Sequence, residues 1–370
     1  MKTYRIGVIA GDGIGPAIVA SARRVLDAVG SQNFGLEWVE IDGGAETFRR
    51  TGAALNPVDL ERIRNEFDAT LKGPVGLPEV RNPDGTEAGV LGGILRNGLD
   101  AYANIRPISL TPGVRSPLTE TERGAAIDYV IVRENTEGLY ASRGKGVGTG
   151  DVHVDQLLVT RAATERIVRQ AFAIAATRTG APADGVSRVT CVDKANVLPS
   201  MAFFRRVFDE VAAEMSAEHP SIQAEHLYVD ATAAALVENP SHFDVIVCEN
   251  LIGDILSDLG AATVGGIGTC PSANIGETAA YFEPVHGSAP DLASTDPTCE
   301  KADPTAQILS AAMMLDYLGE PDAAERIRRA VAEARAELTQ LASVSGKDAR
   351  EMSSLTALTD AVVRTLNLSK

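Results

Sequence analysis

Residues 4–29 read YRIGVIAGDGIGPAIVASARRVLDAV and place an apolar run, a glycine-rich turn and a helical pattern in immediate succession. The run at 4–10 is short and apolar, as in a strand, whereas apolar residues recur every three or four positions over 16–29, as in a helix. The same alternation follows, with a strand pattern at 36–41 and a helix pattern at 56–67. Strands that alternate with helices predict an α/β fold in which crossover helices join parallel strands.

The rest of the chain extends this pattern. Four further runs are expected to form buried strands, at 129–133, 188–192, 226–229 and 245–248. Helices are expected at 160–179, 202–215, 306–317 and 321–342. Because 370 residues exceed the usual size of a single hydrophobic core, we expect two domains, or one large sheet shared between two lobes.

Composition and charge exclude several classes of protein. The net charge of −16 repels phosphate backbones and anionic lipids, so neither nucleic acid nor a membrane surface is expected as a partner. No apolar run is long enough to span a membrane and the N-terminus lacks a signal-peptide pattern, so we expect a cytoplasmic protein. The four cysteines are too widely separated for a disulfide framework or a zinc site and are expected to be free, mostly buried thiols.

The glycine-rich turn Gly11-Asp-Gly-Ile-Gly-Pro16 stands between a strand and a helix, where a phosphate-binding turn would be. The dinucleotide fingerprint needs its third glycine three residues after the second. Here Gly15 follows Gly13 by two residues and Pro16 occupies the fingerprint position. A tight turn without phosphate contact is the alternative, so this motif alone identifies no cofactor.

Asp254 and Asp258 are four residues apart in a helical pattern that starts near Asn250, so both carboxylates lie on one helix face. Like charges one turn apart repel unless a positive charge lies between them, and a hard divalent cation takes oxygen ligands. The pair is therefore a candidate half of a metal site. A solvated helix face whose acids meet only water is the alternative.

Three arginines are candidates for holding an anionic substrate that the overall charge would repel. Arg96, Arg106 and Arg133 are spread along the chain, and two of them border predicted strands. A guanidinium fork matches a carboxylate, so three converging arginines would hold a dicarboxylic or tricarboxylic acid in a fixed orientation. Taken singly, each is typical of a protein surface.

Lys194 and Asn196 follow directly after one predicted strand, and Asp230 ends another. Sites in α/β proteins assemble at such strand ends. A lysine that is partly desolvated there and close to a metal ion has its pKa lowered enough to act as a base. The alternative is an ion pair between Lys194 and the neighbouring Asp193.

Two segments are rich in small residues. Residues 283–291 read EPVHGSAPD and would let a ligand approach the backbone. Asp291 in this segment is suited to accept hydrogen bonds from ribose hydroxyls and would repel a ribose phosphate. Residues 142–155 contain four glycines and are expected to form an exposed arm or loop. Ordinary surface loops are the alternative for both segments.

Taken together, six motifs resemble those of the metal-dependent β-decarboxylating dehydrogenases. That family includes the isocitrate, homoisocitrate, 3-isopropylmalate and tartrate/D-malate enzymes, and the resemblance runs from residue 4 to about residue 318. The motifs are the GDGIG turn, the spaced arginines, RENTEGLY at 133–140, DKAN at 193–196, GDILSD at 253–258 and EPVHGSAPD at 283–291.

The resemblance implies a fold and an assembly. The fold would have two domains and a large mixed, mainly parallel sheet flanked by helices. Residues 1–101 and 265–370 would form a large cofactor-binding domain, and residues 102–264 a smaller domain that makes the contact of a homodimer. The arm at 142–155 would be a clasp exchanged between subunits. The active sites would be shared between the two subunits.

The resemblance also implies roles for the candidate residues. Asp254 and Asp258 would bind Mg²⁺ or Mn²⁺ together with Asp230 donated by the other subunit. Lys194, with Asp230, would take the proton of the substrate hydroxyl as hydride leaves for NAD, and Tyr140 would protonate the enolate left by CO₂. The substrate would be bound by Arg96, Arg106, Arg133 and Asn196. The cofactor would be bound by His286, Gly287, Ser288, Ala289, Asp291 and Asp303, with Asp291 favouring NAD over NADP.

The substrate itself is indicated only by residues 89–96, which read GVLGGILR. Gly92 and Gly93 stand where the family places its specificity determinants, and they match none of its substrate patterns. The absence of a polar partner argues against a third carboxylate, because a buried unpaired charge is costly. We therefore favour a 3-isopropylmalate-like or a tartrate/D-malate-like substrate.

Two alternatives stay within the family: an isocitrate or homoisocitrate dehydrogenase, and a non-catalytic regulatory subunit. A metal-dependent hydrolase without NAD is a third hypothesis, against which Asp291 and the HGSAP segment argue. The chain departs from the family pattern at Ala17, where an acid is usual. It departs again in a lengthened loop at 292–303, where Asp303 replaces a common asparagine and leaves the adenine contacts undetermined.

Overall fold

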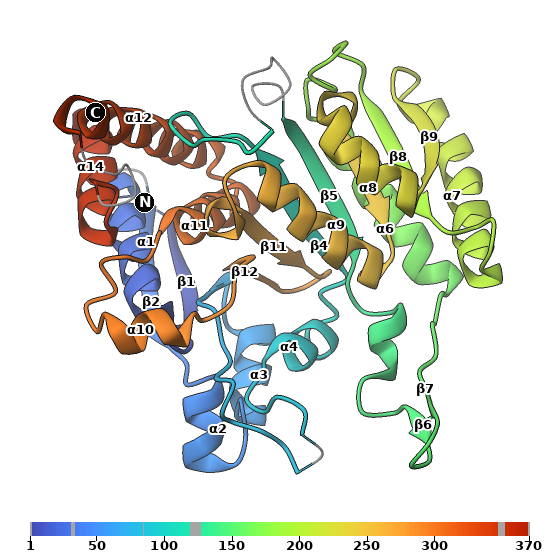
Figure 1. Ribbon diagram of the computed structural model, residues 1–370, viewed down its shortest axis with the longest axis horizontal. Coiled ribbons are helices and arrows are strands. Elements are labelled where there is room, and N and C mark those ends of the chain that lie inside the picture. Colours follow the sequence, from blue (N-terminus) through green and yellow to red (C-terminus); the bar gives the residue numbers. More distant parts are fainter. Residues whose placement is uncertain (1, 31–33, 84, 119–126, 347–351, 369–370) are drawn as a thin grey trace. The chain divides into compact units, whose positions relative to one another are not determined.

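The computed structural model describes residues 2–30, 34–83, 85–118, 127–346 and 352–368. The chain forms two compact units, each with a mixed, mainly parallel sheet flanked by helices, which confirms the predicted α/β fold class (Figure 1). None of the described helices is both long enough and apolar enough to cross a membrane. Unit 1 comprises Met1–Asp100, Thr111–Val114 and Ile267–Lys370, and unit 2 comprises Ala101–Leu110 and Arg115–Gly266.

Unit 1 arranges five strands in the order β2, β1, β3, β12 and β11. Neighbouring strands are parallel except β11 and β12, which pair antiparallel. The strands are β1 (Lys2–Ile9), β2 (Phe34–Glu40), β3 (Ala69–Lys72), β11 (Pro271–Ile275) and β12 (Ala280–Pro284). The helices are α1 (Gly15–Gly30), α2 (Ala45–Thr51), α3 (Pro57–Asn65), α4 (Gly92–Gly98), α10 (Pro290–Thr295), α11 (Thr305–Tyr317), α12 (Pro321–Ser345) and α14 (Leu355–Leu368), with a short 3₁₀ helix η3 (Ile267–Thr269).

The core of unit 1 is built by helices from both ends of the chain. Helix α11 packs on β3, β11 and β12, and α1 lies beside it (Figure 1). The apolar positions of α1 recur at helical spacing, so Ile18, Val25 and Leu26 are buried together. Helix α14 packs against α1 and α12, and the hydroxyl of Thr359 donates a hydrogen bond of 2.9 Å to that of Ser21.

Unit 2 arranges its strands in the order β4, β5, β10, β8 and β9. Strands β4 and β5 pair antiparallel and the others pair parallel, so β5, β10 and β8 end at the same edge. Helix α6 packs with α7, and α8 packs with α9. The strands are β4 (Ala103–Ser109), β5 (Asp128–Glu134), β8 (Arg188–Asp193), β9 (Gln223–Tyr228) and β10 (Val245–Cys248). The helices are α6 (Arg161–Ala175), α7 (Pro199–Glu218), α8 (Val229–Glu238) and α9 (Asn250–Thr263), with short 3₁₀ helices η1 (Leu139–Ser142) and η2 (Pro240–His242).

Two details of the sequence prediction are wrong in unit 2. The strand expected to be buried at 226–229 is β9, whose residues are exposed or half-buried because β9 is the last strand in the order and pairs only with β8. Asp230 does not end this strand. The strand ends at Tyr228, and Asp230 lies in the first turn of α8.

The glycine-rich segment of unit 2 forms a hairpin. Strands β6 (Val147–Gly148) and β7 (His153–Val154) pair antiparallel, and the segment extends away from the other elements of its unit (Figure 1). Its residues from 143 to 155 are exposed, as the composition predicts.

Candidate active site and cofactor loops

The candidate site of unit 2 is built on the first three turns of α9. Glu249 caps this helix, because its carboxylate accepts hydrogen bonds from the backbone N–H groups of Leu251 (3.0 Å) and Ile252 (2.8 Å). Asn250, Asp254 and Asp258 follow at intervals of four residues, so they lie along one face of the helix. The Asp254 side chain is 35% exposed and that of Asp258 is 62% exposed.

Two arginines converge on these carboxylates. The antiparallel register of β4 and β5 places Arg133 opposite Asn104, two residues from Arg106, so the three side chains leave the same face of the sheet. Nη1 of Arg133 lies 2.5 Å from Oδ1 of Asp254, while Nη1 of Arg106 lies 3.5 Å from that atom and 3.6 Å from Oδ1 of Asp258. The acids therefore do not meet only water, and the predicted convergence is confirmed for these two arginines.

Neutral polar side chains orient the two guanidinium groups. Nε of Arg106 donates to Oδ1 of Asn104 (2.7 Å), and Nη1 of Arg106 donates to the hydroxyl of Ser257 (2.6 Å). Arg133, which is fully buried, donates from Nε and Nη2 to Oδ1 of Asn250. The sequence analysis did not single out these three polar residues as site residues. Asn250 could have been predicted from the sequence, because it precedes Asp254 by one helical turn and so lies on the same face of the helix.

Tyr140 joins the same group of residues. Its hydroxyl donates to Oδ2 of Asp254 at 2.9 Å, and Cζ of Arg133 lies 5.7 Å from the centroid of its ring. The loop before Tyr140 turns at Gly138, whose φ is +76°. A Cβ at position 138 would lie 2.4 Å from Oε2 of Glu249, so the turn needs glycine for space as well as for its backbone conformation.

The acids around the site have shifted pKa values. Partial burial raises the pKa of Asp258, and the neighbouring Asp254 adds to this effect while Arg106 opposes it. Burial also raises the pKa of Glu249, although the backbone N–H groups that it caps favour its charged form. Burial therefore disfavours the charged form of both acids, and the neighbouring arginines and backbone N–H groups oppose this effect.

Lys194 and Asp230 form a second group in unit 2. Nζ of Lys194 lies 2.5 Å from Oδ1 of Asp230, and this hydrogen bond lowers the pKa of Asp230. The alternative pairing of Lys194 with Asp193 is not what the structure shows, because both oxygens of Asp193 accept hydrogen bonds of 2.8 Å from Arg205. Asn196 is exposed in the turn after β8.

These two groups do not form a metal site within one chain. Among the residues that the structure describes, no group of three or more His, Cys, Asp or Glu side chains could hold a metal ion. Asp230 therefore does not complete the pair of Asp254 and Asp258 of its own chain.

Arg96 belongs to unit 1, where it is half-buried in the last turn of α4. Gly92 opens this helix. A Cβ at Gly92 would lie 3.9 Å from the Cζ and Nε atoms of Arg96, so it would make only ordinary van der Waals contact with the guanidinium group.

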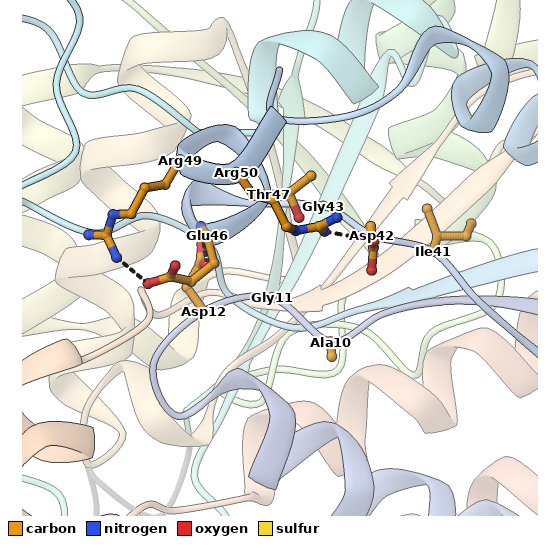
Figure 2. Close-up of a pocket in the computed structure, with 10 residues that line it drawn as sticks. All are labelled: Ala10, Gly11, Asp12, Ile41, Asp42, Gly43, Glu46, Thr47, Arg49 and Arg50. Carbon is orange, nitrogen blue, oxygen red and sulfur yellow. Dashed lines mark hydrogen bonds and ion pairs between the residues drawn. The ribbon is translucent and has the colours of Figure 1, made fainter. Parts of the chain in front are cut away.

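The glycine-rich turn at the end of β1 is held by a buried carboxylate. Asp12 is 3% exposed and accepts hydrogen bonds from the backbone N–H groups of Ala45 (2.8 Å), Glu46 (3.0 Å) and Gly76 (2.8 Å). Figure 2 shows Asp12 beside a cavity of about 420 Å³, near the ion pairs of Arg49 with Glu46 and of Arg50 with Asp42. Through Asp12 the turn is thus joined to the start of α2 and to the loop after β3.

The segment at 286–291 contacts this turn directly. The carbonyl of Ser288 accepts a hydrogen bond of 2.9 Å from Ile14 N, and a Cβ at Gly13 would lie 2.1 Å from that carbonyl oxygen. Ala289 has a φ of +43°, and Asp291 is exposed in the first turn of α10. A cavity of about 730 Å³ lies beside it, lined by Gly13, Glu46, Leu77, Pro78, Glu79, Pro290, Asp291, Ala293 and Ser294.

His286 has a fixed tautomer when it is neutral. Its Nδ1 lies 2.9 Å from the carbonyl oxygen of Gly287, which can only accept, so Nδ1 carries the proton and Nε2 is an acceptor. Nε2 is buried and has no hydrogen-bond partner among the residues that the structure describes. Burial lowers the pKa of His286, because it disfavours the charged ring.

Asp303 is engaged elsewhere in unit 1. Its carboxylate pairs with the guanidinium group of Arg335 on α12 and accepts a hydrogen bond of 2.9 Å from Thr305 N. Arg335 is itself buried and donates from Nε to the hydroxyl of Thr305 at 3.0 Å. These contacts give Asp303 a structural role at the start of α11.

Comparisons with known proteins agree with this geometry. Residues 5–362 match the family model described as isocitrate/isopropylmalate dehydrogenase. A 3-isopropylmalate dehydrogenase of Clavibacter michiganensis subsp. michiganensis is 42% identical over 345 residues, which cover 89% of this chain and 90% of that protein. An isocitrate/homoisocitrate dehydrogenase of Thermus thermophilus is 44% identical over 334 residues, with the same coverage of 89% and 90%. The crystal structure of isocitrate dehydrogenase from Methylococcus capsulatus superposes with a TM-score of 0.79 at 35% identity and covers 98% of this chain and 99% of that one.

Proposed function

Because the chain belongs to the isocitrate/isopropylmalate dehydrogenase family and is therefore a dehydrogenase that decarboxylates hydroxy acids, we propose that it oxidises a 3-substituted D-malate-type acid with NAD and Mg²⁺ or Mn²⁺. The observation that best supports the proposal is the convergence of two arginines and two aspartates in unit 2. Arg106 and Arg133 supply positive charge for a dicarboxylic acid, and Asp254 and Asp258 supply oxygen ligands for a cation.

The two aspartates fit a hard divalent cation. Both carboxylates approach the same nitrogen of Arg106, so they already share one positive neighbour, and both side chains retain exposed surface. When bound, the cation would act as a Lewis acid that makes the substrate hydroxyl more acidic and stabilises the charge that develops as CO₂ leaves. Arg106 and Arg133 would hold the carboxylates of the acid in place.

Proton transfer is assigned to two side chains. Lys194 with Asp230 would remove the hydroxyl proton during hydride transfer, and its ion pair with Asp230 holds the amine in place. Tyr140 would donate the proton that converts the enolate into the final product. Its hydroxyl is already fixed by Asp254, one of the proposed metal ligands.

A second copy of the chain would complete the site. Two carboxylates supply only part of the oxygen shell of a divalent cation, and Asp230 of the same chain does not join them. A carboxylate from a second copy would add to the oxygens that substrate and water provide. Apolar side chains are also exposed on α8 and α9 and in the turn after Lys194, as expected for a surface that another chain covers. They are Val197, Leu198, Tyr228, Val237 and Ile255.

The β6–β7 arm supports the same assembly. Its apolar side chains Val147, Val152 and Val154 are 71%, 59% and 52% exposed, which is unusual for valine on a free hairpin. We propose that two arms pair across a homodimer. Sedimentation of the purified chain tests this, and a monomer at micromolar concentration would contradict it.

The loops of unit 1 fit NAD. The buried acceptor Nε2 of His286 leaves a hydrogen bond for the cofactor to supply, and Asp291 is exposed to accept from ribose hydroxyls. The cavity beside Asp291 also carries the carboxylates of Glu46 and Glu79. Arg49 pairs with both of these acids, so the proposed preference for NAD over NADP rests on Asp291, whose carboxylate would repel a 2′-phosphate.

The substrate that we favour is 3-isopropylmalate-like or tartrate/D-malate-like. The similar proteins include both 3-isopropylmalate and isocitrate/homoisocitrate dehydrogenases and so do not decide between them. Gly92 has no side chain to offer a third carboxylate. Among the residues that the structure describes, the only group near its position is the guanidinium group of Arg96, which the two carboxylates of a malate-type acid would already use. The test is NADH formation with Mg²⁺ or Mn²⁺ over D-malate, tartrate, 3-isopropylmalate, isocitrate and homoisocitrate. Turnover of isocitrate or homoisocitrate alone would refute the preference, and no turnover of any acid would favour a non-catalytic subunit.

A further inference from the structure

Asn250 uses both the donor and the acceptor of its side-chain amide. It opens α9 and is 1% exposed. Its Oδ1 accepts hydrogen bonds from Nε (3.0 Å) and Nη2 (2.6 Å) of Arg133, and its Nδ2 donates to the carbonyl oxygen of Glu137 (2.9 Å). Because a guanidinium group only donates and a carbonyl only accepts, these partners fix the orientation of the amide.

The two partners of Asn250 belong to different parts of the site. Arg133 is the penultimate residue of β5, whereas Glu137 lies in the loop that leads to Tyr140. The loop packs closely on α9, since a Cβ at Gly138 would lie 2.8 Å from Cβ of Asn250. One buried amide therefore connects the guanidinium group to the loop that presents the tyrosine hydroxyl.

The neutrality of the amide has a chemical consequence. Arg133 already has one anionic partner, Asp254, at 2.5 Å. A carboxylate at position 250 would offer the guanidinium group a second negative charge and would compete with a substrate carboxylate for it. It would also repel the carbonyl of Glu137. Asparagine holds the same edge of the guanidinium group and leaves its charge for the substrate.

We propose that Asn250 is a positioning residue for the reaction, which orients Arg133 toward the acid and couples it to the loop that presents Tyr140. This inference rests on the proposed function and deepens it. Binding of an acid to Arg133 would then also set the position of Tyr140, because both are held by the same side chain.

The test compares Asn250→Asp and Asn250→Ala with the wild type. In Asn250→Asp, the KM for the acid should rise at least tenfold while the melting temperature changes little, because the new ion pair compensates for the lost hydrogen bond. In Asn250→Ala, both the acid KM and kcat should worsen at least tenfold, because Arg133 and Tyr140 both lose their fixed positions. The KM for NAD should stay within threefold in both variants.

Asn135→Ala is the matched control. Asn135 lies in the same loop and is also buried, and its amide donates to the carbonyl of Ala101 at 2.9 Å. Its loss should lower the melting temperature without raising the acid KM. If the Asn250 variants behave like this control, or if Asn250→Asp keeps the acid KM within threefold of the wild type, Asn250 has only a structural role and the inference is wrong.

A binding measurement separates this inference from the proposed function. If the wild type turns over none of the five acids, the proposed function fails, and thermal stabilisation by D-malate in the absence of NAD then reports on acid binding without turnover. D-malate should stabilise the wild type at concentrations at least tenfold lower than Asn250→Asp requires. Equal stabilisation of the two proteins, or none of the wild type, would overturn the inference.

Discussion

Replacing Gly253 by alanine tests how closely α9 packs against Arg133. In an exposed helix, this change stabilises a protein by about 1 kcal/mol, because alanine has the higher helix propensity. Here the new Cβ would lie 2.6 Å from Cγ and 2.7 Å from Cβ of Arg133. Arg133 is fully buried and cannot move aside at low cost.

The unfavourable effects should exceed the gain in propensity. Overpacking a buried site costs about 1–3 kcal/mol. Displacing Arg133 would also weaken its charge-assisted hydrogen bonds with Asn250 and Asp254, each of which contributes about 1.5–3 kcal/mol. We expect Gly253→Ala to lower the free energy of unfolding by about 1–3 kcal/mol, which lowers the melting temperature by roughly 2–10 °C.

The assay pairs calorimetry with the acid KM, which should rise at least tenfold because Arg133 binds the acid. Gly92→Ala is the control, since its Cβ would come no closer than 3.9 Å to Arg96 and should change stability by less than about 0.5 kcal/mol. A Gly253→Ala protein that melts at a higher temperature than the wild type, with an unchanged acid KM, would refute the packing of α9 on β5.

Three further variants test the other parts of the site. Asp258→Asn should abolish thermal stabilisation by MnCl₂ and lower kcat at least 100-fold, and unchanged stabilisation would exclude this residue as a ligand. Asp291→Ser should raise the KM for NAD at least tenfold and reduce the preference for NAD over NADP, whereas a uniform loss with both cofactors would argue against a ribose contact. Burial lowers the pKa of His286 below its ordinary value of 6.5, so the folded state disfavours the charged ring and loses stability as the pH falls through this region. The melting temperature of His286→Gln should therefore fall less than that of the wild type between about pH 7.5 and pH 5.5. An equally large fall in both proteins would contradict this.

The elements of the fold were predictable because most of them have a strong local signal. The apolar run of β1 and the recurrence of apolar residues every three or four positions in α1 predicted the boundaries of both elements to within two residues at each end. The burial of β9 was not predictable from its own residues, since an edge strand differs from a central one only in how many neighbours it pairs with. The start of α8 was missed for a similar reason, because Val229 suits either a strand or a helix.

The site was predictable only in part. The spacing of Asp254 and Asp258 indicates a shared helix face, but the arginines beside them were predicted only as partners of an anionic substrate and not of these two acids. The pairing of Lys194 with Asp230 spans 36 residues, and that of Arg133 with Asn250 spans 117, so no local pattern reports either contact. The role of Asp303 was not predictable for the same reason. Its ion pair with Arg335 on α12 depends on tertiary packing, which the residues next to Asp303 in the sequence do not indicate.

The division of the chain between the two units determines the order in which they can be completed during synthesis. Unit 2 is nearly continuous and has all of its residues once position 266 has been added, whereas unit 1 needs both ends of the chain. The contact between Ser21 and Thr359 joins residues 338 positions apart, which a ribosome separates by about 20–70 s at 5–20 residues per second. During that interval the apolar faces of β1 and α1 lack their final cover, so newly made chains that stall before α14 should depend on chaperones and should aggregate without them.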